Sequence, residues 1–169
     1  GNPMENASYL ESGQKVYVDG VLTTEVVIDD SVSSIKDNAF YGFKNMTKVV
    51  LSKRVEYIGA QSFACSGITE VVIPDRCRTI AYNAFSTCEH LSHVTIGSSV
   101  TEIQSWAFSY DPYLTEVYCK PLVPPTMGWE VFLKSSNLAK IYVPREVVDA
   151  YMFADGWNEY ASLIHPYDF

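Results

Sequence analysis

A small residue followed by phenylalanine recurs along this chain of 169 residues at a nearly constant interval, and this repeat constrains the fold more than any other feature. The phenylalanines are spaced by 23, 22, 23 and 24 residues, at Phe40, Phe63, Phe85, Phe108 and Phe132. Apolar triplets move in parallel, at Val26–Ile28, Val49–Leu51, Val71–Ile73, Val94–Ile96, Val117–Cys119 and Ile141–Val143. The 22-residue step comes from one deletion, because Phe63 and Ile68 are five residues apart where other repeats have six. Columns that shift together through one deletion indicate a true repeat.

Two further apolar columns complete the repeating unit. One contains Ile35, Ile58, Ile80 and Ile103, and the other contains Met46, Ile68, Leu91, Leu114 and Leu138. The unit reads as a strand, apolar-x-x-V-x-I, then a turn and V-x-x-I-x-x-x-A-F. A single coil cannot bury its own apolar face, so coils stack with their strands about 4.8 Å apart in a parallel sheet. This period and strand pattern are typical of leucine-rich repeats, and the phenylalanines should form an internal ladder.

The repeats resemble those of a known family, the BspA-like leucine-rich repeat proteins of anaerobic bacteria. The resemblance is carried by Val32–Phe43, by Val100–Phe108 and by a C-terminal run from Tyr142–Tyr151 to Ala154–Trp157. It covers about residues 21–169. It implies a secreted or surface-displayed binding module, an adhesion-type role, and no particular target.

We therefore expect an α/β-type leucine-rich repeat solenoid that is rich in β structure. It should be a short right-handed superhelix with one parallel sheet of about six strands, an N-terminal hairpin cap and a C-terminal helical cap. Asp19-Gly20 predicts the hairpin turn, and Pro144 and Gly156 predict the limits of the helix. The expected parts are a flexible segment 1–13 and a single domain 14–169, made of an N-cap 14–28, regular repeats 29–119, and a degenerate repeat with the C-cap at 120–169.

Charge excludes some classes of partner. The chain has 20 acidic and 12 basic residues, a net charge of −8, which disfavours nucleic acid and anionic membranes as main partners. Its apolar runs are too short for membrane insertion or for a secretory signal core. We expect a monomer outside the cytoplasm, secreted or at the cell surface, and leave open a signal or lipid anchor upstream.

The four cysteines do not have the spacing of a zinc site. Cys77 and Cys119 fall in apolar columns, so we expect them in the core. Cys65 and Cys88 are assigned to one column on neighbouring coils, within reach of a disulfide but with unsuitable side-chain directions. Free buried thiols are the favoured interpretation, and the bridged alternative stays open.

No motif for catalysis or cofactor binding is found. Cys88 and His90 are close in sequence, but Cys88 should point inward while His90 lies on a turn. Nucleophile-elbow, phosphate-loop, dinucleotide-binding and zinc-protease motifs do not occur. We expect no enzyme, no catalytic residue, no cofactor and no metal.

The outer strand face holds the candidate binding residues. A charged column alternates in sign, at Glu25, Lys48, Glu70, His93, Glu116 and Lys140, and beside it runs an apolar stripe, at Val27, Val50, Val72, Thr95, Tyr118 and Tyr142. The predicted ligand face consists of Val50, Val72, Thr95, Tyr118, Tyr142, His93, Glu70 and Glu116. β-Propensity alone could explain the stripe. A host or extracellular-matrix protein is the favoured partner. The alternatives are a glycan stacked on Tyr118, Tyr142 and Trp129, and a spacer without ligand.

Overall fold

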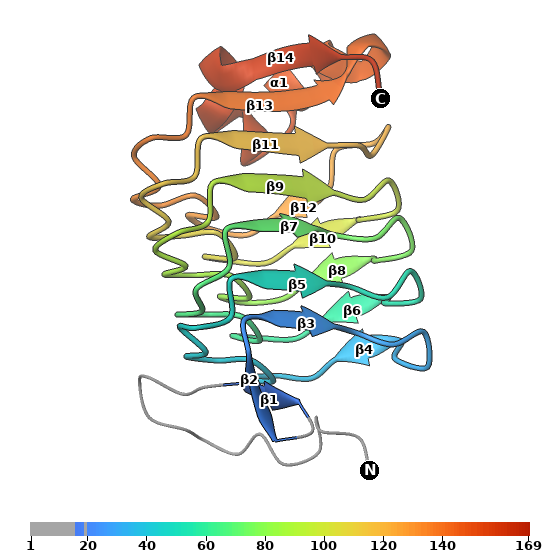
Figure 1. The fold of residues 1–169 in the computed structure, drawn as a ribbon. Helices are drawn as coiled ribbons and strands as arrows, with labels where there is room; N and C mark the ends of the chain where they lie inside the picture. The colour runs from blue at the N-terminus through green and yellow to red at the C-terminus, as the bar shows by residue number, and fades with distance from the viewer. Residues whose placement is uncertain (1–15, 19) are drawn as a thin grey trace.

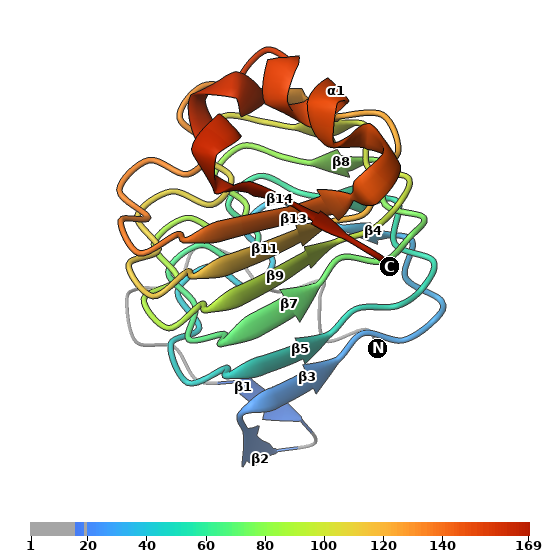
Figure 2. The same cartoon turned by 90° about the horizontal axis from the view of Figure 1, so that it is seen from above.

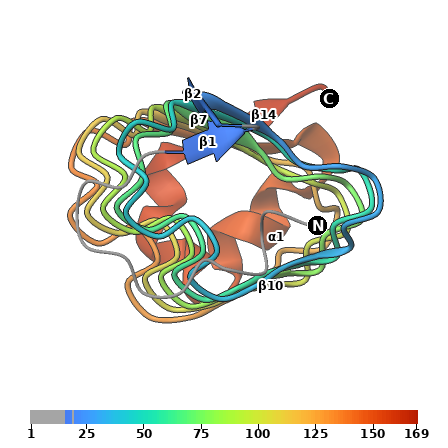
Figure 3. The ribbon, with the colours of Figure 1, turned by 60° about the horizontal axis from the view of Figure 1, so that its bottom comes forward.

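The computed structural model describes residues 16–18 and 20–169, and in it the repeats form a stack of coils (Figure 1). Seen from the N-terminal end, successive coils superpose into one closed loop (Figure 3). Each coil places one strand on each of two opposite sides, so two rows of parallel strands enclose the core. The solenoid predicted from the repeat is confirmed.

Among the described residues, the first row has seven strands: β3 (Glu25–Val27), β5 (Lys48–Val50), β7 (Glu70–Val72), β9 (His93–Ile96), β11 (Glu116–Cys119), β13 (Lys140–Pro144) and β14 (Ile164–Tyr167). Its hydrogen-bonded order is β3-β5 and, separately, β7-β9-β11-β13-β14, all parallel. Strand pairing is therefore interrupted once, between β5 and β7.

The second row was not predicted. It is a parallel five-stranded sheet of two-residue strands: β4 (Ser34–Ile35), β6 (Tyr57–Ile58), β8 (Thr79–Ile80), β10 (Glu102–Ile103) and β12 (Thr126–Met127). The isoleucine column supplies the inward residue of its first four strands, and Ile35, Ile58, Ile80 and Ile103 have no exposed surface. Strands this short contain only one inward residue, so the sequence shows the column without the alternation that would indicate a sheet.

The phenylalanine ladder runs through the core as predicted. Ring centroids of successive residues lie 5.2, 5.1, 5.2 and 5.8 Å apart, along Phe40, Phe63, Phe85, Phe108 and Phe132. Phe63, Phe85 and Phe108 are fully buried, and the planes of neighbouring rings in this central part differ by 2–3°. Identical coils stacked in register place identical rings on top of one another.

Left-handed residues repeat at the turns. Cys65, Thr87, Tyr110 and Lys134 have φ angles of 58–61°, which places Cys65 in their column. The Cys65 N–H donates to the Ser86 carbonyl as the Thr87 N–H donates to that of Ser109. The predicted common column of Cys65 and Cys88 is therefore wrong: Ser66 is the neighbour of Cys88, at 3.5 Å, because the deletion lies after Ser66. All four cysteines are free, Cys77, Cys88 and Cys119 buried and Cys65 half-buried.

An antiparallel hairpin, β1 (Val16–Val18) and β2 (Val21–Thr23), lies at the N-terminal end of the stack (Figure 1). It confirms the predicted strand pair. Gly20 has a φ of +79°, as a tight hairpin turn requires. Asp19 and the expected flexible segment 1–13 lie outside the described residues.

The C-terminal cap lies across the other end of the stack (Figure 2). It consists of a 3₁₀ helix (Arg145–Val147), α1 (Val148–Phe153), a second 3₁₀ helix (Trp157–Leu163) and β14. Tyr151 and Trp157 are fully buried, and they donate hydrogen bonds of 2.8 Å to the carbonyls of Pro121 and Pro125. The helical cap is confirmed, although α1 ends at Phe153 rather than near Gly156. No helix in the described ranges is long and apolar enough to cross a bilayer.

Candidate functional site: the outer face of the first sheet

The predicted apolar stripe lies on the outer face of the first row of strands. The exposed fractions of Val50 and Val72 are 42% and 60%, whereas Thr95, Tyr118 and Tyr142 are half-buried. Their flanking neighbours point into the core, as alternation along a strand requires. The stripe therefore changes along the stack, from exposed valines to packed tyrosines.

The charged column is in register wherever the strands pair. Glu25 is opposite Lys48, and the two side chains form an ion pair of 2.9 Å. Glu70 is opposite His93, and Glu116 is opposite both His93 and Lys140. The column, in which glutamates alternate with lysine or histidine, is continuous except between β5 and β7.

His93 and Glu116 contact each other at the middle of the face. The His93 Nε2 lies 3.7 Å from a Glu116 carboxylate oxygen, and its Nδ1 lies 2.8 Å from the Ser92 hydroxyl. Both side chains contact neighbours within the sheet. They contribute polar edges to the face.

Tyrosines gather at the C-terminal end of the face. The Tyr118 and Tyr142 rings stack at 4.7 Å, and Tyr167 lies across both, with ring centroids 5.3 and 5.4 Å away. These distances are those of favourable aromatic pairs. We call Tyr118, Tyr142 and Tyr167 the tyrosine cluster. It presents a preformed aromatic surface on three adjacent strands.

Polar contacts hold the rings of the cluster in place. The Tyr118 hydroxyl donates to Glu116 at 3.0 Å, and the Lys140 ammonium lies 5.8 Å from the centre of the Tyr142 ring. Desolvation, together with the acceptor Glu116, raises the pKa of Tyr118 to about 12. The phenol therefore stays protonated, and remains a hydrogen-bond donor, throughout the physiological pH range.

Sequence reasoning missed the last strand of this surface. β14 pairs with β13 in parallel and aligns His165 with Tyr142, so Tyr167 enters the tyrosine cluster. Phe169 continues the surface, its ring centroid 4.9 Å from that of Tyr167. The repeat columns end before β14, and only the alternation of Ile164, His165, Pro166 and Tyr167 could have indicated a strand.

Trp129 does not belong to this surface. It follows β12 in the second sheet, where its backbone N–H donates to the Ser105 hydroxyl, and the residue is 80% exposed. The expected proximity of Trp129 to Tyr118 and Tyr142 is wrong, because the coil carries it to the opposite sheet. A sugar site formed by these three rings together is excluded.

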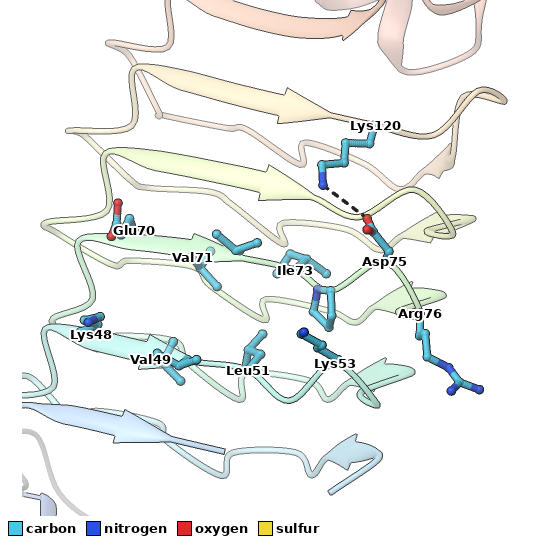
Figure 4. A pocket seen from close by; sticks show the side chains of 13 residues that line it. Lys48, Val49, Leu51, Lys53, Glu70, Val71, Ile73, Asp75, Arg76 and Lys120 are labelled. Carbon is cyan, nitrogen blue, oxygen red and sulfur yellow. Dashed lines mark hydrogen bonds and ion pairs between the residues drawn. The ribbon is translucent and has the colours of Figure 1, made fainter. Parts of the chain in front are cut away.

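A groove lies at the other end of the face, over the interruption between β5 and β7. It has a volume of about 550 Å³. Figure 4 shows valine side chains along it, Lys48 and Glu70 near one end, and Lys53, Arg76 and Lys120 near the other. Lys120 contacts Asp75 at 3.5 Å on the β7 side of the groove.

The described residues contain no group of three or more histidine, cysteine or carboxylate side chains that could hold a metal ion. Burial raises the pKa of the Cys77 and Cys119 thiols to about 12, and that of Cys88 well above its usual value. Protonated buried thiols are poor nucleophiles and poor metal ligands.

Comparison with known proteins agrees with the repeat. A family model described as the BspA type leucine rich repeat region matches in six copies over residues 13–139. No curated protein matches the chain. Among solved structures, a leucine rich cell surface protein from Faecalibacterium prausnitzii A2-165 is similar, with 22% identity and a TM-score of 0.47. The match covers 69% of this chain and 40% of that protein, so the chain spans less than half of its length.

Proposed function

Because the chain belongs to the BspA-type leucine-rich repeat family, we propose that it is a non-catalytic protein-interaction module that binds through the outer face of its first sheet. The tyrosine cluster is the observation that carries this proposal. Exposed aromatic rings held on rigid strands supply a large contact area at a low cost in conformational entropy. Tyrosine also offers a hydroxyl for directional recognition.

The arrangement of the cluster supports a protein partner. Three rings from β11, β13 and β14 pack edge and face, and Phe169 extends them outward. Tyr167 and Phe169 are 40% and 52% exposed, so the cluster retains apolar surface that a partner can cover. Hot spots of protein interfaces have this composition, a few aromatic rings among polar neighbours.

We propose an extracytoplasmic location, at the cell surface or as a secreted protein, and an extracellular protein as the partner. The family resemblance supports this location. Surface labelling of intact producing cells with a membrane-impermeant reagent tests it. Labelling only after lysis would contradict it.

Binding of purified protein to arrays of extracellular proteins and of glycans tests the function. We expect saturable binding to a protein, lost in the double variant Tyr118→Ala/Tyr142→Ala. Binding to glycans alone would favour a sugar-binding module. Absence of any specific binding would favour a structural spacer.

A further inference from the structure

Strand pairing between β5 and β7 stops after its first hydrogen bond. The Thr69 N–H donates to the Thr47 carbonyl at 3.1 Å, and no ladder follows in this part of the described chain. At the neighbouring intervals, Ile28 donates to Val50 and Ile73 donates to Thr95, both at 2.8 Å. The equivalent bond, from the Leu51 N–H to the Val72 carbonyl, is not formed. We call this open interval the seam.

Two features of the sequence flank the seam. The shortened repeat precedes β7 directly, and there Gly67 approaches Lys44 so closely that a Cβ would collide with the Lys44 carbonyl. At the other end of β7, Ile73 is followed by Pro74, which has no N–H to donate.

The groove described above lies over the seam, and we call it the seam groove. Its apolar surface comes largely from Val50 and Val72, which are 42% and 60% exposed. The groove runs along the strands, from Lys48 and Glu70 near one end to Lys53, Arg76 and Lys120 near the other, so an extended chain can lie along it (Figure 4).

Charge defines the chemistry of the occupant. The seam groove is lined by Lys48, Lys53, Arg76 and Lys120, four of the 12 basic residues in a chain of net charge −8, and by two acidic residues, Glu70 and Asp75. Among the described residues, Lys53 has no ion-pair partner, and Arg76 reaches Glu56 only at 3.8 Å. A local positive charge on an acidic protein attracts carboxylates.

We propose that the seam groove binds an extended, acidic peptide segment of the partner protein. Small apolar side chains of that segment contact Val50 and Val72, and its carboxylates pair with Lys53 and Arg76 (Figure 4). This proposal rests on the proposed function, since it assigns a second contact on the same binding face.

A fluorescein-labelled hexapeptide of alternating valine and aspartate, blocked at both ends, tests this by fluorescence anisotropy. We expect saturable binding that weakens with added salt, and none for the valine–lysine hexapeptide. Lys53→Glu/Arg76→Glu should weaken binding by about tenfold or more, since two attractions become repulsions. Lys36→Glu/Lys134→Glu makes the same change in net charge at exposed sites elsewhere and should leave binding unchanged.

Three results would overturn the proposal for the seam groove. They are no binding of the acidic hexapeptide, equal losses of hexapeptide affinity in the two charge-reversed variants, or stronger binding of a single-stranded oligonucleotide. The variant Tyr118→Ala/Tyr142→Ala leaves the groove intact and separates the two proposals. If the wild type does not bind the hexapeptide but binds a protein partner that this variant no longer binds, only the proposal for the seam groove is contradicted. A chain that captures no protein contradicts the proposed function.

Discussion

The Cys88 N–H donates a hydrogen bond of 2.8 Å to Oδ1 of Asp111 on the next coil, and both residues are fully buried. In the described structure, Oδ2 of the same carboxyl group has no hydrogen-bond partner. Desolvation raises the pKa of Asp111 to about 8, and the Cys88 hydrogen bond offsets only part of this effect. The core therefore contains one carboxyl group that is more stable protonated than charged.

Stability should consequently depend on pH through Asp111. The folded state holds this proton up to about pH 8, and the unfolded state releases it near pH 3.8. The contribution of this proton to the free energy of unfolding is complete below pH 3.8. It is lost progressively as the pH rises toward 8. Asp111→Asn keeps an acceptor for the Cys88 N–H and cannot ionise. The free energy of unfolding of this variant should therefore not fall through this group as the pH rises.

Urea unfolding of the wild type and Asp111→Asn between pH 4 and 9 measures the difference. The exposed Asp155→Asn is the matched control and should follow the wild type. If all three proteins keep parallel profiles, the Asp111 carboxyl does not ionise in the folded core as we describe.

The phenylalanine ladder should dominate the stability of the stack. Phe85 lies between Phe63 and Phe108 at 5.1 and 5.2 Å, so Phe85→Ala opens a cavity between two coils and should cost about 3–5 kcal/mol. Phe153→Ala removes the same side chain at a site that is 81% exposed and should change stability by less than about 0.5 kcal/mol. Equal unfolding midpoints in urea for the two variants would contradict the stacking.

Gly156 fixes the turn between α1 and the second 3₁₀ helix. Its φ is +80°, and a Cβ there would lie 2.9 Å from the Cβ of Met127. An L-residue at positive φ costs about 1–2 kcal/mol. Gly156→Ala should therefore lower the free energy of unfolding by more than this amount. Gly20→Ala imposes the same strain at φ +79° with no atom within 4 Å, so it should cost less in thermal unfolding. If Gly20→Ala destabilised the protein more than Gly156→Ala, the cap would tolerate the contact of the new Cβ with Met127.

The core of the fold could be predicted from the sequence because stacked coils turn a sequence period into spatial columns. The Phe63–Phe85 stack and the pairing of Tyr118 with Tyr142 both follow from one register. Residues that do not belong to a repeat column were not predictable in this way. Tyr167 lies in the site because β14, a strand beyond the last repeat, pairs with β13. Trp129 lies outside the site because its part of the coil belongs to the second sheet.

The deletion shows why the rest of the site escaped prediction. One missing residue is visible in the spacing of Phe63 and Ile68, but it does not reveal which hydrogen bonds break. The shortened turn brings Gly67 against the Lys44 carbonyl, and this close approach is a property of the folded turn. Assigning Cys65 to the wrong column has the same cause, since the spacing alone allows the gap to be placed before Cys65 or after Ser66.

Binding through the tyrosine cluster is tested most directly by affinity for the protein that the array identifies as the strongest ligand. Tyr118→Ala/Tyr142→Ala should raise its Kd by about a thousandfold, because two hot-spot rings at about 2 kcal/mol each amount to about 4 kcal/mol. The matched control Tyr57→Ala/Tyr82→Ala removes two exposed tyrosines away from the face and should leave the Kd unchanged. An unchanged Kd in the first variant, or equal losses in both, would contradict binding at this surface.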